Sequence, residues 1–375
     1  MSAPLLLGAG PSPVPERVLH ALAQPTIGHL DARFGEIMDR CSASLREVFG
    51  TENRATLPVS ATGRGGMQAM VDNFAAAGDR IVCGVHGLFG ARMADALERA
   101  GADVVRVEAP WGRAIPTEAL LKAAEPGMRA MFVVHAETST GVLQPLAGLA
   151  DCCAAHDALL LVDCVTSLGG LPVELDAQGI DVAFAGTQKC LNCPPGLAPF
   201  SAGARALERL PERSRSWYFD LRLLLGYWDG ASGGGRSYHH TAPINMIYGL
   251  DEALRILLEE GLESRFARHA RAHEALRSAL SCFGLERIAP EGEQLCSLLA
   301  VRVPPAIDEA GVRGELLQRH GIEISSGVGE FAGRAWRIGV MGEGARLEPQ
   351  RALVSALAEL LPGEGALEAL AAGWS

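Results

Sequence analysis

The segment Ala158-Leu159-Leu160-Leu161-Val162-Asp163 reads as a buried strand that ends in a carboxylate. A second apolar run, Asp181-Val182-Ala183-Phe184-Ala185-Gly186-Thr187-Gln188, is also predicted to be a buried strand, and Lys189 follows it directly. In open parallel sheets, ligands bind outside the carboxyl ends of the strands. We therefore expect the side chains of Asp163 and Lys189 to point into one crevice.

The spacing of this pair leaves two interpretations open. Pyridoxal 5′-phosphate (PLP) requires both groups, because a lysine amine forms a Schiff base with its aldehyde and a carboxylate keeps its ring nitrogen protonated. The alternative is a buried ion pair, or two strand-end residues with unrelated roles. Short motifs of this kind are hypotheses until their structural context is known.

The first half of the chain alternates apolar runs with amphipathic segments. Helices are predicted at 62–76, 89–100, 117–125 and 149–157, and strands at 81–85, 104–107 and 130–134. The first of these helices has apolar residues at i, i+3, i+4 and i+7, counted from Met67. Such alternation predicts a doubly wound α/β domain, with a parallel sheet covered by helices on both faces.

The pattern changes after about residue 200. The glycine-rich stretch 230–235 predicts a flexible turn. A long helical pattern then runs from Leu250 to about Cys282, with an interruption at Gly261. Further strands are predicted near 298–303 and 336–340, and further helices near 309–319 and 348–361. These elements predict a smaller C-terminal α+β unit.

The bulk properties exclude several classes of protein. The chain has 375 residues, 48% of them hydrophobic and 21% charged, and a net charge of −11, whereas a nucleic-acid-binding protein needs a basic face. The first ten residues lack the positive charge of a signal peptide. No apolar run reaches the ~18 residues that a bilayer span requires. We therefore expect a cytoplasmic protein with no nucleic-acid or membrane partner.

The cysteine content also favours a cytoplasmic protein. Nine cysteines, an odd number, favour reduced thiols over a disulfide framework. Cys190 and Cys193 form a CxxC motif, but no second CxxC or histidine pair completes a zinc site. The preferred interpretation is that both are small residues packed near Lys189, and no metal is expected.

The segment Thr62-Gly63-Arg64-Gly65-Gly66 precedes the Met67 helix. Small residues at a helix start let backbone N–H groups approach an anion, and the helix dipole favours negative charge there. One interpretation is a phosphate-binding loop that uses Thr62 and Gly63, and the other is simple N-capping by Thr62. A second glycine motif, Gly8-Ala9-Gly10-Pro11-Ser12-Pro13, ends in proline with no predicted helix behind it, which argues against dinucleotide binding.

Two further polar features stand next to apolar strands. The run His135-Ala136-Glu137-Thr138-Ser139-Thr140-Gly141 follows the strand at 130–134, and it either lines the same crevice or forms a turn before the next helix. Arg337 lies inside the apolar segment Trp336-Arg337-Ile338-Gly339-Val340. A buried arginine needs a partner, which is either an internal carboxylate or the carboxylate of an amino- or oxo-acid substrate.

Several of these motifs occur together. They include Asp163-Cys164-Val165-Thr166-Ser167-Leu168-Gly169-Gly170, Gly186-Thr187-Gln188-Lys189, Glu137-Thr138-Ser139-Thr140-Gly141-Val142 and Tyr238-His239-His240-Thr241. In this combination the chain resembles the class V, fold-type I PLP-dependent enzymes, and within them the alanine–glyoxylate and serine–pyruvate aminotransferases. The similarity covers nearly the whole chain, from Gly10-Pro11-Ser12 to Arg337-Ile338-Gly339.

The resemblance implies a role for individual residues. Lys189 would bind PLP covalently and Asp163 would pair with its ring nitrogen, which makes these two the catalytic residues. The other cofactor-binding residues it implies are Thr62, Gly63, Arg64 and Gln188, with Phe89 and Val165 on the two ring faces, Ser139 near the ring hydroxyl, and Tyr238 and Thr241 from the neighbouring subunit. Arg64 stands where many relatives have histidine. The substrate-binding residues it implies are Arg337 for the carboxylate, with Gly10, Ser139 and Tyr238.

The resemblance also implies the architecture and the reaction. It divides the chain into an N-terminal arm at 1–20, a large α/β domain with a mostly parallel seven-stranded sheet at 21–258, and a small α+β domain at 259–375. A site shared between subunits implies a homodimer. The implied reaction is transamination of a small amino acid, of the alanine or serine type, with a 2-oxo acid such as glyoxylate or pyruvate, in a ping-pong cycle.

Other activities of the same class remain as alternatives. Arg64, Phe89-Gly90 and Gly186-Thr187-Gln188-Lys189-Cys190-Leu191 are similar to the ureidoglycine–glyoxylate aminotransferases, whereas His29 and Tyr238 are similar to the alanine/serine type, which we favour. A pyridoxamine–pyruvate aminotransferase is a third possibility. Gln188 disfavours a cysteine desulfurase, which has histidine before its lysine. Retention of Lys189, Asp163 and Arg337 argues against a non-catalytic PLP-binding protein.

Overall fold

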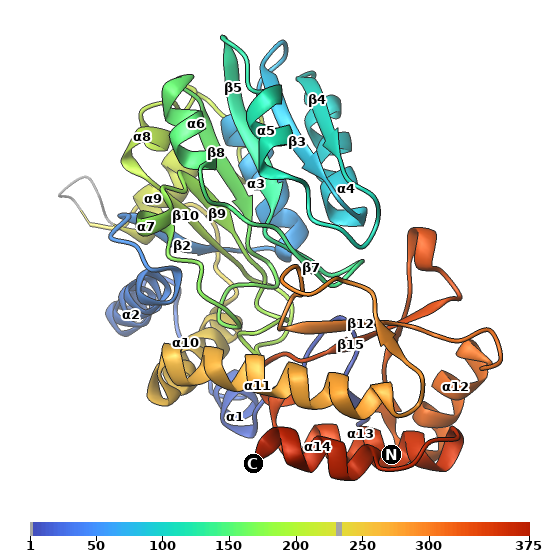
Figure 1. Cartoon of the computed structure of the whole chain (residues 1–375). Helices are drawn as coiled ribbons and strands as arrows, with labels where there is room; N and C mark the ends of the chain where they lie inside the picture. Colours follow the sequence, from blue (N-terminus) through green and yellow to red (C-terminus); the bar gives the residue numbers. More distant parts are fainter. Residues whose placement is uncertain (1–2, 230–234) are drawn as a thin grey trace.

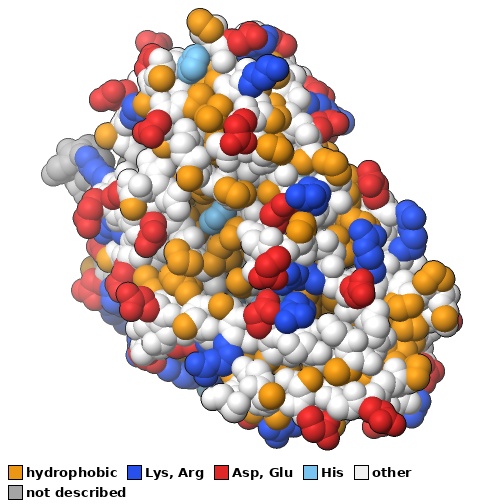
Figure 2. All heavy atoms as spheres, in the orientation of Figure 1, with side chains coloured by type: hydrophobic (Ala, Val, Ile, Leu, Met, Phe, Trp, Pro, Cys, Tyr) orange, Lys and Arg blue, Asp and Glu red, His pale blue; other side chains and the backbone are white. Residues whose placement is uncertain are grey.

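The computed structural model describes residues 3–229 and 235–375, so the turn predicted at 230–235 lies almost wholly outside the described residues. Figure 1 shows a larger unit built around one sheet and a smaller unit that carries both ends of the described chain. On the face in Figure 2, acidic and basic side chains are interspersed among apolar ones. No helix within the described ranges is long and apolar enough to span a bilayer.

The larger unit contains the mostly parallel seven-stranded sheet that the sequence led us to expect. Its strands, in order across the sheet, are β2 (Ala55–Val59), β10 (Ala198–Ala202), β9 (Val182–Phe184), β8 (Leu159–Asp163), β5 (Met128–Val134), β3 (Arg80–Val85) and β4 (Asp103–Glu108). β10 runs antiparallel to both of its neighbours, and the other pairs are parallel. β8 is buried throughout, and β5 is buried except at the half-buried Arg129, because helices cover the sheet, as is usual for parallel sheets.

The helices of this unit pack on the strands through their apolar sides. They are α2 (Ala32–Phe49), α3 (Gly63–Phe74), α4 (Leu88–Arg99), α5 (Thr117–Ala123), α6 (Leu149–Ala155), α7 (Leu175–Gln178), α8 (Ala204–Leu207) and α9 (Leu221–Trp228). A small hairpin, β6 (Ala136–Glu137) with β7 (Val142–Leu143), follows β5. Phe132, Phe184 and Phe200 from three strands are at most 1% exposed, which places the main core inside this layered arrangement.

The strand predicted at 181–188 is shorter in the structure than expected. β9 ends at Phe184, and the chain continues through Gly186 into a turn, so the expectation that Lys189 closes a strand is wrong. The buried backbone of this turn is satisfied locally, because the N–H of Cys193 donates to the carbonyl of Thr187 at 3.1 Å. Lys189 therefore lies in a turn beyond the strand end.

Two strands of the sheet were not predicted. β2 and β10 each contain a proline, and these prolines, Pro58 and Pro199, lie opposite each other in the antiparallel register. Proline lacks an N–H donor and weakens a strand prediction. The two strands form because the carbonyl of Pro199 still accepts from Ala185 N–H at 2.7 Å and the remaining residues are buried.

The smaller unit has its own sheet and core. α10 (Ile244–Glu260) and α11 (Leu262–Ser281) meet at Gly261, where φ is +82°, so the predicted interruption is confirmed. An antiparallel sheet follows in the order β11 (Glu286–Arg287), β12 (Leu298–Arg302), β15 (Ala335–Gly339), β14 (Ser325–Ser326). The remaining elements are α12 (Glu309–His320), β13 (Ile322–Glu323), two short 3₁₀ turns at 329–331 and 342–345, α13 (Leu347–Leu360) and α14 (Ala366–Trp374).

The N-terminal segment joins the smaller unit to the larger one. β1 (Leu5–Leu6) pairs in parallel with β13, and Leu7 is buried in the core of the smaller unit. The chain then crosses to the turn of Lys189, where Ser12 N–H donates to Gln188 O at 2.9 Å. A helix that was not expected behind the Gly8–Pro13 segment, α1 (Glu16–Leu22), packs on α10. The division at residues 20 and 258 stays a prediction.

Candidate active site

Asp163 is fixed by the sheet. It is the last residue of β8, at the carboxyl end where parallel strands bind ligands, and its side chain is buried. The N–H of Val165 donates to Asp163 Oδ1 at 2.8 Å. Burial raises the pKa of Asp163 to about 7, because an isolated carboxylate is poorly solvated there, although the Val165 hydrogen bond opposes this effect. A cationic partner would keep this group ionised.

Lys189 is fixed by contacts from distant parts of the chain. Ser12 Oγ donates to the carbonyl of Lys189 at 2.7 Å, and Lys189 Nζ donates to the carbonyl of Ala9. Burial, followed by the positive charge of Arg337, lowers the pKa of Lys189 to about 8. A β-carbon at Gly10 would collide with the Lys189 side chain, and Gly10 also has φ of +103°, so only glycine fits there.

These two groups share one cavity, as the sequence predicted. The cavity has a volume of about 100 Å³ and is lined by Gly63, Arg64, Met67, Phe89, Asp163, Val165, Phe184, Gln188 and Lys189. Seven of these nine residues are among the predicted cofactor-binding residues; Met67 and Phe184 are the additions. The structure thus brings residues from four separate segments to the end of the sheet.

Three features in or next to the cavity suit an anionic ligand, although Thr62 itself is not among the lining residues. Thr62 precedes the first residue of α3 and its hydroxyl makes no capping hydrogen bond, which leaves it available to an anion at the helix start. Gly63 at that start is closely packed, since a β-carbon there would touch Val165 Cγ2 at 3.4 Å. Gln188 Oε1 is buried and has no hydrogen-bond partner among the described residues, as expected for a group that awaits a ligand.

Glu137, to which the sequence motif gave no separate role, anchors one wall. Its carboxylate is fully buried and accepts from the backbone N–H of Phe89 at 3.0 Å and of Gly90 at 3.3 Å. It therefore caps α4 and fixes the position of Phe89 in the cavity. Burial raises the pKa of Glu137, and hydrogen bonds from Ser139 oppose this effect. Only its place in the polar run at 135–141 could have drawn attention to it.

Ser139 supports the same turn rather than the cavity wall. Its hydroxyl donates to Glu137 Oε1 at 2.5 Å and accepts from Leu88 N–H at 3.0 Å. The hydroxyl proton is thus already engaged, and Ser139 is not among the residues that line the cavity. Its direct contact with the cofactor or the substrate stays a prediction.

Arg337 has unused hydrogen-bonding capacity next to Lys189. Its Nε donates to Ser326 O at 2.8 Å and its Nη1 to Thr138 O at 3.3 Å, so the strand β14 and the β6–β7 turn hold it. Among the described residues no carboxylate forms an ion pair with it, which removes the internal salt bridge that the sequence left open. Burial lowers the pKa of Arg337. The guanidinium is available to an external carboxylate.

Tyr238 and Thr241 do not reach the cavity of their own subunit. Both are exposed, and the Tyr238 ring lies 5.2 Å from the ring of His29. A hydrogen bond of 2.7 Å between His240 Nε2 and Ser60 Oγ ties this segment to the residues just before Thr62. The positions are compatible with a contribution to a neighbouring subunit, and that contribution stays a prediction.

Sequence reasoning did not find the residue that supports the Lys189 turn from the smaller unit. Arg265 on α11 is 2% exposed and donates to Gly169 O at 2.8 Å, to Cys190 O at 2.6 Å and to Asn192 Oδ1 at 3.0 Å. Glu260 neutralises it at 2.7 Å. No local pattern marks this arginine, because its partners are distant in sequence.

All nine cysteines are free, and Cys190 and Cys193 are buried. Burial raises the pKa of both thiols, to about 11 and about 12, so they are poor nucleophiles and metal ligands at neutral pH. Over residues 3–229 and 235–375, no group of histidine, cysteine and acidic side chains could hold a metal ion.

A mostly parallel sheet with a buried aspartate at the carboxyl end of β8 and a buried lysine in the turn beyond β9 is the arrangement expected of a fold-type I PLP-dependent enzyme. A family model described as Aminotransferase class-V matches residues 5–332. The chain is 37% identical over 362 residues to the alanine–glyoxylate aminotransferase of Callithrix jacchus, covering 95% of this chain and 87% of that protein. It is 36% identical over 367 residues to the (S)-ureidoglycine–glyoxylate transaminase of Bacillus subtilis, covering 92% and 87%.

The fold gives the same result. The crystal structure of an alanine–glyoxylate aminotransferase from Nostoc superimposes with a TM-score of 0.92, at 42% identity over 96% of each chain. The chain belongs to the class-V aminotransferase family, and it is a PLP-dependent transaminase.

Proposed function

We propose that this enzyme transfers the amino group of a small amino acid, of the alanine or serine type, to a 2-oxo acid such as glyoxylate or pyruvate in a ping-pong cycle. The observation that carries the proposal is that the Lys189 amine and the Asp163 carboxylate line one cavity, while the unpaired Arg337 guanidinium lies near enough to Lys189 to lower its pKa. The names of the relatives support the substrates, since those proteins act on alanine, ureidoglycine and glyoxylate.

The cavity residues would hold the cofactor as follows. Lys189 would carry it covalently, Asp163 would face its ring nitrogen, and the rings of Phe89 and the methyls of Val165 would cover its two faces. Thr62, Gly63 and Gln188 would bind the phosphate at the start of α3. Arg64, which lines the cavity beside Phe89, would border the ring.

When bound, PLP supplies an electron sink for the electrons released from the substrate Cα. The protein side chains manage the protons and the orientation. Lys189 has its pKa lowered to about 8 by burial, so a useful fraction of its amine is neutral near neutral pH and can accept the Cα proton. Asp163, ionised by a cationic partner, would hold the ring nitrogen protonated. Arg337 would grip the carboxylate that amino and oxo acids share.

The assembly we propose is a homodimer with shared sites. Tyr238 and Thr241 are exposed and lie outside their own cavity, so they would complete the phosphate site of the partner. We further propose a cytoplasmic location, which the nine free cysteines support, and no nucleic-acid or membrane partner, which the net charge of −11 supports.

The second candidate is a ureidoglycine–glyoxylate aminotransferase, and a pyridoxamine–pyruvate aminotransferase is the third. Arg64 in the cavity wall favours the second candidate. His29 and Tyr238, whose rings lie 5.2 Å apart, are the residues at which this chain resembles the alanine/serine type, which we favour.

A half-reaction screen tests the choice. PLP-loaded protein is mixed with alanine, serine, aspartate, ureidoglycine or pyridoxamine, and the loss of the absorbance band of the bound cofactor is followed. We expect alanine or serine to bleach the band fastest and glyoxylate or pyruvate to restore it. Faster bleaching by ureidoglycine would transfer the assignment to the second candidate.

A further inference from the structure

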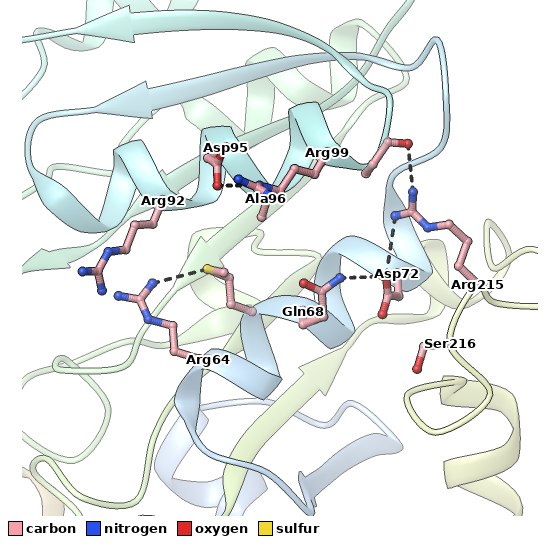
Figure 3. Close-up of a pocket in the computed structure, with 11 residues that line it drawn as sticks. Arg64, Gln68, Asp72, Arg92, Asp95, Ala96, Arg99, Arg215 and Ser216 are labelled. Atoms are coloured by element: carbon pink, nitrogen blue, oxygen red, sulfur yellow. Dashed lines mark hydrogen bonds and ion pairs between the residues drawn. The ribbon is translucent and has the colours of Figure 1, made fainter.

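A hollow next to the active-site cavity has no assigned role. It lies between α3 and α4, has a volume of about 650 Å³, and shares Arg64 and Met67 with the cavity of Lys189 (Figure 3). Its lining residues are Arg64, Met67, Gln68, Asp72, Arg92, Asp95, Ala96, Arg99, Ala100, Arg215 and Ser216. Four of these are arginines, in a chain whose net charge is −11.

At one end of the hollow the arginine charges are compensated. Arg99 forms an ion pair with Asp95 at 2.8 Å. Arg215 lies 3.6 Å from Asp72 and donates to the carbonyl of Ala100 at 2.8 Å. The two acidic residues of the hollow are therefore used at this end, and Asp72 also accepts from Gln68.

At the end nearest the cavity no carboxylate of the described residues forms an ion pair with an arginine, and Asp163 and Glu137 act on Arg64 only at longer range. Among the described residues, Arg64 has one weak hydrogen bond, to Met67 Sδ at 3.6 Å, and Arg92 has no hydrogen bond or ion pair. Figure 3 shows the two guanidinium groups facing each other. Both lie near the ring of Phe89, with their central carbons 4.9 and 6.0 Å from its centroid. Two like charges held together favour an anion between them, because guanidinium groups bind carboxylate in a bidentate way.

We propose that Arg64 and Arg92 form an anion-binding site that captures the carboxylate of the incoming 2-oxo acid at the entrance to the Lys189 cavity. This inference rests on the proposed function for its ligand. The overall negative charge repels an anionic substrate, and a local pair of positive charges beside Phe89 reverses that field where the substrate enters. Arg337 then holds the same carboxylate deeper in the site.

The test uses PLP-loaded protein, in which the phosphate site is already filled, and inorganic sulfate as the probe. Calorimetry measures sulfate binding to the wild type, Arg92→Gln, Arg92→Lys and Arg99→Gln. Arg99 is the matched control, since it lies on the same helix face but is neutralised by Asp95. We expect wild type and Arg99→Gln to bind sulfate equally, Arg92→Lys to bind it more weakly, and Arg92→Gln to lose most of the binding.

The kinetic arm measures kcat/KM for glyoxylate at low and high ionic strength. We expect Arg92→Gln to lower kcat/KM about 10-fold at low salt with kcat nearly unchanged, and the difference to close as salt screens the charges. Equal sulfate binding and equal salt dependence in Arg92→Gln and Arg99→Gln would overturn the site. If glyoxylate is not a substrate, the proposed function fails. The sulfate measurement still shows whether Arg64 and Arg92 bind an anion.

Discussion

Asp163 and Lys189 reach the same cavity by different routes. Asp163 is positioned by β8 in the centre of the main sheet, and the one hydrogen bond that its side chain makes among the described residues comes from Val165, two residues away. Lys189 lies beyond its strand and is positioned by Ala9, Ser12 and Arg265, which come from the N-terminal segment and the smaller unit. The Asp163 carboxylate is therefore held by local sheet structure, whereas the position of the Lys189 amine depends on the packing of distant parts of the chain.

The largest expected effect concerns the amine itself. Lys189→Ala should reduce transamination by about 10⁴-fold or more, since it removes both the covalent attachment and the base. The fold should be retained because the turn is held through backbone groups of Lys189 and Cys190. Steady-state turnover and circular dichroism measure the two effects. A variant with wild-type turnover would refute the assignment of Lys189.

The second prediction concerns the local setting of Asp163 in cofactor-free protein. Its pKa is raised to about 7, above the unfolded value, so the native state binds the extra proton between about pH 4 and pH 7. Stability should therefore fall as pH rises through this range, by up to about 4 kcal/mol from this group. Asp163→Asn should remove that slope. Urea unfolding at several pH values measures it, and an unchanged slope in the variant would contradict the buried carboxylate.

The third prediction concerns the shared carboxylate anchor. Arg337→Ala should raise KM about 10²-fold for the amino acid and the oxo acid alike, because one guanidinium serves both half-reactions. Arg337→Lys should recover part of the loss, since it keeps the charge but not the bidentate geometry. Kinetics with each substrate varied in turn measure the effect. An increase in KM for only one of the two substrates would contradict the proposal that Arg337 binds both carboxylates.

The smallest effect should come from the long-range support of the amine. Arg265→Met should lower kcat about 10-fold by loosening the Lys189 turn, consistent with the sensitivity of catalysis to small misplacements. KM should change little, because Arg265 lies on the side of the turn that contacts Gly169 and Cys190. Arg271→Met, at an exposed position of the same helix, is the control. Equal kcat in the two variants would show that the turn holds its shape without Arg265.

The same contrast explains what could be predicted from the sequence. The strand of Asp163, the helix that follows Thr62 and the interruption at Gly261 follow from local patterns, and the structure contains all three. The sequence predicts a strand in place of the turn of Lys189 because Ala185, Gly186 and Thr187 prolong the apolar run with small side chains, and apolar periodicity does not register a chain reversal.

Other features were beyond the reach of local patterns. β2 and β10 were missed because their prolines weaken any strand prediction, although the register places Pro58 and Pro199 opposite each other. The roles of Glu137 and Arg265 depend on partners 47 to 96 residues away in sequence, which only the fold brings together.

The attachment of the cofactor to Lys189 can be tested directly because the chain has very few lysines. The chain contains only two lysines, Lys122 and Lys189, and Lys122 is exposed on α5. PLP-loaded protein is reduced with borohydride and digested, and the mass of each lysine-containing peptide is measured by mass spectrometry. We expect the cofactor mass to be attached to the Lys189 peptide alone. Attachment to the Lys122 peptide, or to neither, would contradict it.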